Sequence, residues 1–231
     1  MKSFLLACIV LICFPALTIG RAGAETRPLA LIFCHEDQNA FPWVFPAENG
    51  TGVVGLDLVL IDLLSKELNI PIATVGMPWK RCLRSLETQE VHGAFASSFV
   101  AERQAQGRYP ELPNGGPDPD RRIHTSGYSL YVPDGSTLDW NGTDFLNLNG
   151  TLGIQSGFSV AENLDALGAA YEENAGVEAN LEKVLRNRIQ GAVLQTQRAD
   201  HVLTSDSRFR NSLKKAPIPI SEKPYYLMLS F

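Results

Sequence analysis

Residues 70–98 read IPIATVGMPWKRCLRSLETQEVHGAFASS and contain a strand, a helix and a second strand in direct succession. The apolar run from Ile70 to Met77 predicts a strand that stops at Pro78. From Trp79 to Gln89, large apolar residues recur at helical spacing, at positions 79, 82, 83 and 86, which predicts an amphipathic helix. Val91 to Ser98 is again apolar and predicts the next strand.

The segments before this unit continue the same alternation. Pro28 to Cys34, PLALIFC, predicts a buried strand, and Leu56 to Asn69 predicts a helix with positions 60, 61, 64 and 68 on its apolar face. A strand-helix-strand-helix-strand order implies a parallel sheet with helices packed on its faces. Ligands of such sheets bind outside the carboxyl ends of the strands. We therefore expect the polar and aromatic residues that follow each strand to converge on one edge of the sheet.

A second α/β region covers about residues 135–217. Thr151 to Gln155 and Gly191 to Thr196 predict strands, and helices are expected between them. Ser159 and Glu162 have the spacing of a capping box at a helix start. The final stretch, EKPYYLMLSF, predicts one more strand.

The first residues have the pattern of a secretory signal peptide. Lys2 precedes an apolar stretch from Phe4 to Leu17, and Ala22-Gly23-Ala24 is the small-x-small pattern that signal peptidase cleaves. We predict a signal peptide over residues 1–24 and an exported mature protein. A lipoprotein alternative would use Cys8, which lies inside the apolar stretch itself.

The charge of the mature chain argues against nucleic acid as a partner. Cleavage after Ala24 would remove Lys2 and Arg21, which leaves 18 basic against 25 acidic residues and a formal charge of −7. Such a surface repels nucleic acid.

Cys34 and Cys82 are the two cysteines that would remain after cleavage. In an oxidising compartment an even pair predicts a disulfide, and two buried free thiols are the alternative. Two cysteines without CxxC spacing and four scattered histidines predict no metal site.

Several short motifs follow one another along nearly all of the chain after residue 24. They are Gly55-x-Asp57, Trp79, Ser98-x-x-x-Glu102-Arg103, Tyr128, Gly157-Phe158-Ser159, Leu185-x-x-Arg188 and Lys223-Pro224-Tyr225-Tyr226. Their order and spacing resemble bacterial periplasmic solute-binding proteins of family 3, the group best known for amino-acid uptake. Within that family, the PWKRC form at 78–82 looks like a poorly characterised branch.

The resemblance implies a type II periplasmic binding protein fold, in which two α/β lobes close over a ligand cleft through two hinge strands. Lobe one would comprise residues 25–128 plus 221–231, and lobe two residues 132–218, with hinges near 128–132 and 218–222. Family members usually continue with a helix that packs on lobe one, whereas this chain stops at Phe231. Either the branch is short or the sequence is truncated and lobe one lacks a cover.

The resemblance also implies a ligand site. Arg103 falls on the position that holds a ligand carboxylate, for which a two-pronged guanidinium is well suited. The alternative is a surface arginine. The other implied contacts are the Ser98 hydroxyl, an aromatic wall from Trp79 (with Phe41 and Trp43 as weaker candidates), carboxylate-capping amides of Gly157, Phe158 and Ser159, and Asp37 or Glu36 for a cationic group. The alternatives are a core tryptophan at 79, a serine at 159 that caps its own helix, and a solvated acid at 37.

Gln195 departs from the family pattern. Typical amino-acid binders carry an acid there that pairs with the ligand's α-ammonium group, and a neutral glutamine removes most of that attraction. Because a buried ammonium without a counter-charge is unfavourable, we hypothesise that the ligand is a carboxylate or another polar small molecule rather than an ordinary α-amino acid.

These features predict a monomeric periplasmic protein that binds a small molecule and serves an ABC-type permease, without a cofactor. One alternative is a periplasmic enzyme of dehydratase type, with His35, Glu36 or Asp37 as general acid or base. Another is a sensory or accessory protein. The sequence contains no GxSxG, HExxH or phosphate-loop motif that would favour an enzyme.

Overall fold

A computed structural model describes residues 30–231, so the predicted signal peptide lies outside the described residues. The strands are β1 (Leu31–Glu36), β2 (Phe45–Pro46), β3 (Val53–Val54), β4 (Ile72–Met77), β5 (Gly93–Ser98), β6 (His124–Pro133), β7 (Asp139–Trp140), β8 (Phe145–Leu146), β9 (Leu152–Gln155), β10 (Tyr171–Asn174), β11 (Gly191–Gln195), β12 (Leu213–Lys215) and β13 (Ser221–Leu229). The helices are α1 (Leu56–Leu68), α2 (Trp79–Glu87), α3 (Val160–Ala166), α4 (Val177–Leu185), α5 (Thr196–Ser205) and α6 (Ser207–Arg210), with 3₁₀ turns η1 (Ala101–Ala105) and η2 (Pro119–Arg121).

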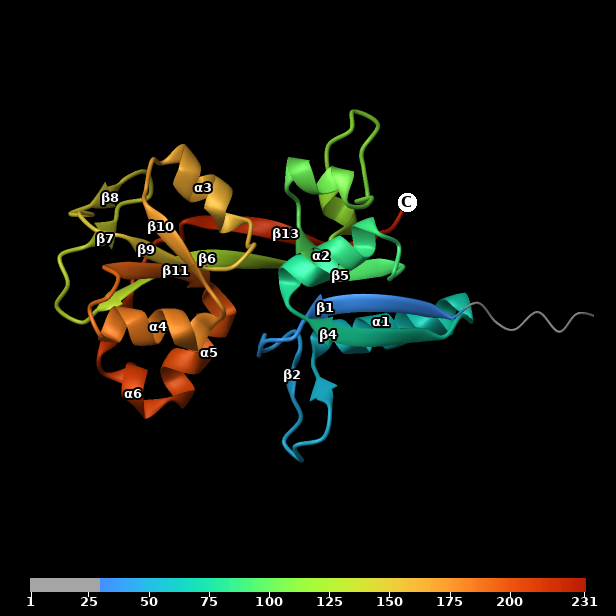
Figure 1. The fold of residues 1–231 in the computed structure, drawn as a ribbon, viewed down its shortest axis with the longest axis horizontal. Helices are drawn as coiled ribbons and strands as arrows, with labels where there is room; N and C mark the ends of the chain where they lie inside the picture. The colour runs from blue at the N-terminus through green and yellow to red at the C-terminus, as the bar shows by residue number, and fades with distance from the viewer. Residues whose placement is uncertain (1–29) are drawn as a thin grey trace, which may run out of the picture.

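Two parallel groups of strands are joined by one antiparallel pair (Figure 1). The strand order is β10-β9-β11-β6-β13-β5-β1-β4, and β12 pairs with β6. Strand β1 pairs in parallel with β4 and β5, and β9 pairs in parallel with β10 and β11. Strands β6 and β13 lie between these groups and pair antiparallel. We call β1–β5 with α1 and α2 the first lobe, and β7–β12 with α3–α6 the second lobe. The α/β two-lobe fold is confirmed, while the residue boundaries given for lobes and hinges stay predictions.

The strand-helix-strand unit at 70–98 forms as its pattern indicates. Strand β4 ends at Met77, Pro78 precedes α2, and β5 follows within the same sheet. The predicted apolar face of α2, at positions 79, 82, 83 and 86, is buried. Helix α2 packs on β1 and β5. Because α2 begins two residues after the end of β4, its first residue lies at the carboxyl edge of the parallel strands.

Helix α1 buries only part of the face expected. Leu60 and Leu68 are 39% and 48% exposed, so their placement on the packed face was wrong. Ile61 is buried and Leu58 and Leu64 are partly buried, and these three pack with β1, β4 and β5 residues. The outer face of α1 is apolar and exposed because no described element covers it. Its exposed apolar residues are Leu56, Val59, Leu60, Leu63 and Leu68.

The second lobe has an apolar core on each face of its sheet. Alternate strand residues point to opposite faces, so Val193 packs with α3 residues such as Leu164, while Leu194 packs with α4 residues such as Leu181. This double cover explains why β11 is buried throughout. None of the helices in residues 30–231 has the length and apolar character needed to cross a bilayer.

A disulfide joins Cys34 of β1 to Cys82 of α2, as the sequence predicted. Both residues are fully buried, in a cluster with Leu86, Ala94 and Tyr226. The bridge therefore ties α2, whose first residue is Trp79, to the central strand of the first lobe.

We expect the double variant Cys34→Ala/Cys82→Ala to be less stable than the mature protein. A bridge across 48 positions restricts the unfolded chain, and its loss should lower the free energy of unfolding by about 4 kcal/mol. Urea unfolding followed by circular dichroism measures the difference, and reduced wild type provides the matched control. Two titratable thiols in the unfolded, unreduced mature protein would contradict the bridge.

Candidate ligand-binding cleft

A cavity lies between the two lobes and is lined by both of them and by β6 and β13. It contains about 500 Å³ free of protein atoms, including its opening to solvent. The lobes are close together in this structure, because hydrogen bonds from Ser98 and Arg103 cross from one lobe to the other. The polar and aromatic lining residues are His35, Glu36, Trp43, Asp57, Trp79, Phe95, Ser98, Arg103, His124, Tyr128, Phe158, Ser159, Gln195, Arg198 and Tyr225.

Arg103 lies in η1, immediately after β5, and is only 7% exposed. This burial excludes the surface-charge alternative. Its Nη1 donates to the Ser98 carbonyl oxygen at 2.9 Å, and its Nη2 donates across the cleft to the Gly157 carbonyl oxygen at 2.8 Å. Its guanidinium carbon lies 5.6 Å from the Trp79 ring centroid. Arg103 thus connects the lobes and lines the cavity at the same time.

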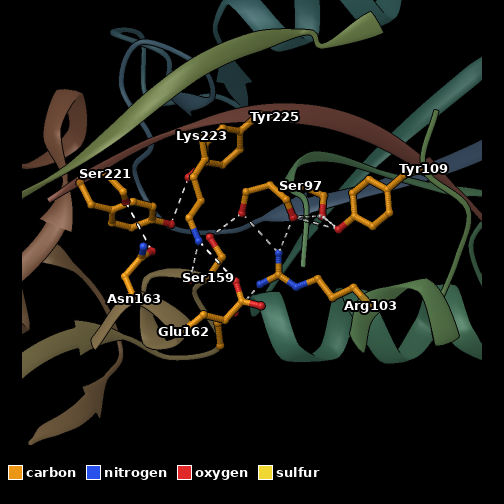
Figure 2. A network of polar contacts seen from close by, with 12 residues as sticks. Ser97, Arg103, Tyr109, Ser159, Glu162, Asn163, Ser221, Lys223 and Tyr225 are labelled. Atoms are coloured by element: carbon orange, nitrogen blue, oxygen red, sulfur yellow. Dashed lines mark hydrogen bonds and ion pairs between the residues drawn. The ribbon is translucent and has the colours of Figure 1, made fainter. Parts of the chain in front are cut away.

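Ser98 and Ser159 face each other across the cleft. The Ser98 hydroxyl donates to the Ser159 hydroxyl at 2.6 Å. Ser159 makes no side-chain cap to α3, so the predicted capping box was wrong. Figure 2 shows its partner Glu162 turned towards Lys223 of β13, whose ammonium also donates to the Ser159 carbonyl oxygen at 2.8 Å. The hydroxyl contact between the lobes has replaced the cap.

Trp79 is 6% exposed and belongs to both a core cluster and the cavity lining. The core and cleft-wall alternatives are therefore compatible. Trp43 lines the cavity as well. Phe41 does not line the cavity. It stacks instead on His201, with ring centroids 4.2 Å apart, and is 36% exposed.

The backbone amides predicted to cap a carboxylate are only partly available. The Phe158 amide donates to the Gln155 carbonyl oxygen at 3.2 Å, so it is already paired in this structure, and its contact with a ligand stays a prediction. Gly157 turns the chain at a φ of +76°, a conformation that favours glycine. A side chain at this position would also meet Lys80 of the first lobe at 2.9 Å.

Gln195 ends β11 and is 6% exposed. Its amide nitrogen donates to the Tyr225 hydroxyl at 2.6 Å, and that hydroxyl donates to the Tyr128 hydroxyl at 3.0 Å. The glutamine is therefore fixed against the two strands that join the lobes, and it lines the cavity without a charge.

Two acids lie at the end of β1. Glu36, its last residue, lines the cavity, and Asp37, the residue after it, does not. Asp37 is exposed and lies outside the cavity lining. Burial raises the pKa of Glu36 to about 7, and the nearby Arg198 guanidinium opposes that shift. Burial also lowers the pKa of His35.

The sequence reading missed Arg198. It lies in the first turn of α5, only 2% exposed, with its guanidinium 5.5 Å from the Phe158 ring centroid. Its contacts to Gln155 Oε1 and the Gln38 carbonyl oxygen are long, at 3.3 and 3.4 Å, and its Nε has no partner among the described residues. Its position three residues after Gln195, just past a strand end, was the sequence feature that could have identified it.

No group of three or more potential metal ligands occurs within residues 30–231.

Comparisons with known proteins agree with this fold. The chain is similar in structure to an ancestral arginine-binding protein bound to glutamine, with a TM-score of 0.70, 16% identity and coverage of 87% of this chain and 84% of that one. The chain is also similar to a binding component of an ABC transporter from Wolinella succinogenes, complexed with lysine, with a TM-score of 0.69, 15% identity and coverage of 87% of this chain and 82% of that one. For an ancestral amino-acid-binding protein that is a precursor of cyclohexadienyl dehydratase, the TM-score is 0.66 and the identity 16%, with coverage of 87% of this chain and 81% of that one. No family model matches the chain, and no curated protein matches its sequence.

Glu36 should make stability depend on pH. Its pKa of about 7 in the folded protein, against 4.5 as the ordinary value, means that the folded state binds the extra proton. The resulting stabilisation is full below about pH 4.5 and is lost as the pH rises through 7, amounting to at most about 3 kcal/mol. Urea unfolding of wild type and Glu36→Gln from pH 5 to 7.5 should show a fall in the wild type that the variant lacks. Glu48→Gln, at an exposed acid, is the control, and parallel curves for wild type and Glu36→Gln would refute the assignment.

Proposed function

We propose that this protein binds a small ligand with a carboxylate group in the cavity between its lobes. The observation that carries the proposal is the buried, incompletely paired Arg198, because a guanidinium removed from water requires anionic or carbonyl partners. Because Arg198 lines the cavity, a carboxylate bound there would supply the acceptor that its Nε lacks. Arg103, whose guanidinium lines the same cavity, adds a second positive charge.

Gln195 argues against an ordinary α-amino acid as the ligand. It supplies no negative charge for an α-ammonium group, and its amide nitrogen already donates to Tyr225. The neighbours that bind glutamine or lysine share only the fold with this chain at 15–16% identity. A few charge-assisted hydrogen bonds and an aromatic wall are compatible with a dissociation constant of about 1 μM.

In this proposal the protein works as a periplasmic monomer, is exported by the signal peptide at 1–24, and presents its closed form to an ABC-type permease. The PWKRC form of α2 would mark a distinct branch of family 3. The alternative is a sensory or accessory role for the same closed form. Permease and ATPase genes beside this one would favour uptake, and a kinase or oxidoreductase gene would favour the sensory or accessory role.

An enzyme on the same fold is the second candidate, and Glu36 is the observation that favours it. A carboxyl group with a pKa of about 7 in a cavity can donate and accept protons near neutral pH. The likeness to a dehydratase precursor is one of fold. Proton NMR of carboxylates incubated with the protein would show turnover, and its loss in Glu36→Gln with binding retained would establish this candidate.

Titration calorimetry with carboxylates and with common amino acids tests the binding proposal. Arg103→Gln and Arg198→Gln should each weaken carboxylate binding at least tenfold, since each loses charge-assisted hydrogen bonds worth roughly 1.5–3 kcal/mol. Arg84→Gln, at an exposed position of α2, is the matched control and should bind as wild type does. Tight binding of a common α-amino acid, or affinities insensitive to both cleft arginines, would overturn the proposal.

A further inference from the structure

Three polar side chains that the carboxylate proposal does not use gather in the cavity. Trp43 follows β1, Asp57 lies in the first turn of α1, and His124 begins β6. All three line the cavity. They come from separate parts of the chain, so only the folded state brings them together.

These side chains contact one another closely. The His124 ring stacks between Trp43, with ring centroids 3.8 Å apart, and Tyr225, with centroids 4.9 Å apart. His124 Nε2 lies 3.5 Å from Asp57 Oδ2, which is too long for a good hydrogen bond. The Asp57 amide donates to the Trp43 carbonyl oxygen at 3.1 Å.

Gly55 permits this contact between Trp43 and α1. Its φ is +145°, and a Cβ at this position would lie 2.0 Å from the Trp43 carbonyl oxygen. The Gly55-x-Asp57 motif therefore has a steric reason in this chain, since it allows the Asp57 amide to reach the Trp43 carbonyl oxygen.

The polar atoms of this group lack partners. Of the seven buried side-chain nitrogen or oxygen atoms without a hydrogen bond among the described residues, four belong to it, namely Trp43 Nε1, Asp57 Oδ2 and both ring nitrogens of His124. The His124 and Asp57 side chains are only 7% and 4% exposed. Buried polar groups are nearly always hydrogen-bonded in folded proteins, so such a cluster in a cavity indicates that a bound group completes it.

The unpaired atoms select the chemistry of that group. The indole N–H of Trp43 is a donor, the Asp57 carboxylate is an acceptor, and an imidazole can supply either. An anion would be repelled by Asp57. A cation would leave the indole N–H donor without an acceptor. A neutral group that both donates and accepts matches all three side chains.

We propose that Trp43, Asp57 and His124 form a second subsite that binds an uncharged hydroxyl or carboxamide at the end of the ligand opposite its carboxylate. The subsite rests on the proposed carboxylate-binding function and specifies the ligand class further, as a hydroxy- or carbamoyl-carboxylate. A plain aliphatic acid would leave the hydrogen-bonding groups of this subsite without partners.

A ligand series with four to six carbons tests the subsite on the full mature protein. At each length, calorimetry compares the ω-hydroxy acid and the ω-carbamoyl acid with the unsubstituted acid, the ω-amino acid and the dicarboxylic acid. At one length or more, the first two should bind about tenfold more tightly than the unsubstituted acid, and more tightly than the charged analogues. Equal binding of hydroxy and unsubstituted acids, as expected if only water fills the subsite, or preference for a charged end group, overturns the inference while leaving the carboxylate proposal intact. Failure of every carboxylate to bind overturns both.

Two variants test the named side chains. Trp43→Phe keeps the stacked ring but removes the N–H, so the affinity ratio of hydroxy to unsubstituted acid should fall several-fold. Asp57→Asn should lower the same ratio, and Asp62→Asn, an exposed acid on the same helix that pairs with Lys66, is the matched control. Thermal unfolding verifies that each variant is folded. A ratio unchanged in Trp43→Phe would show that the group only packs the first lobe and would overturn the subsite.

Discussion

The antiparallel pairing of β6 with β13 is the constraint on which the rest of the structure depends. These two strands are the link between the parallel strands of one lobe and those of the other. Their register places Tyr225 opposite His124, and both side chains line the cavity. Tyr128, on the same pair, receives the hydrogen bond of the Tyr225 hydroxyl. The strands that connect the lobes therefore also form part of the cavity wall.

Two chemically different groups line the cavity. Arg198 has an Nε donor without an acceptor among the described residues, while Trp43, Asp57 and His124 offer both donors and acceptors. Glu36 lies near Arg198, and burial holds the pKa of its carboxyl at about 7. Near neutral pH, Glu36 is thus only partly ionised and only partly compensates the two buried arginines. This distribution of charge supports the proposal of a ligand with an anionic end and a neutral polar end.

Sequence patterns located much of the site. Ser98, Arg103, Trp79, Phe158, Ser159 and Gln195, all named from the sequence, line one cavity. Of the acids at 36 and 37, Glu36 lines the cavity, while Asp37 is exposed, as the solvated-acid alternative expected, and lies outside the lining. The capping box at Ser159 satisfied a local rule, yet the serine hydroxyl accepts a hydrogen bond from Ser98 of the other lobe. Local spacing cannot anticipate a partner that lies 61 residues away.

By itself, the sequence determined the alternation of strands and helices, because hydrophobic period and the stops at Pro and Gly are local properties of the chain. It also determined which residues follow the strand ends, and hence the edge at which a ligand would bind. Only the tertiary structure decided which faces are covered, as the exposed leucines of α1 demonstrate. It alone decided that Arg198 is buried and that His124 stacks between Trp43 and Tyr225. Burial and pairing depend on segments that are distant in sequence, and the charge and hydrogen-bonding state of a side chain depends on both.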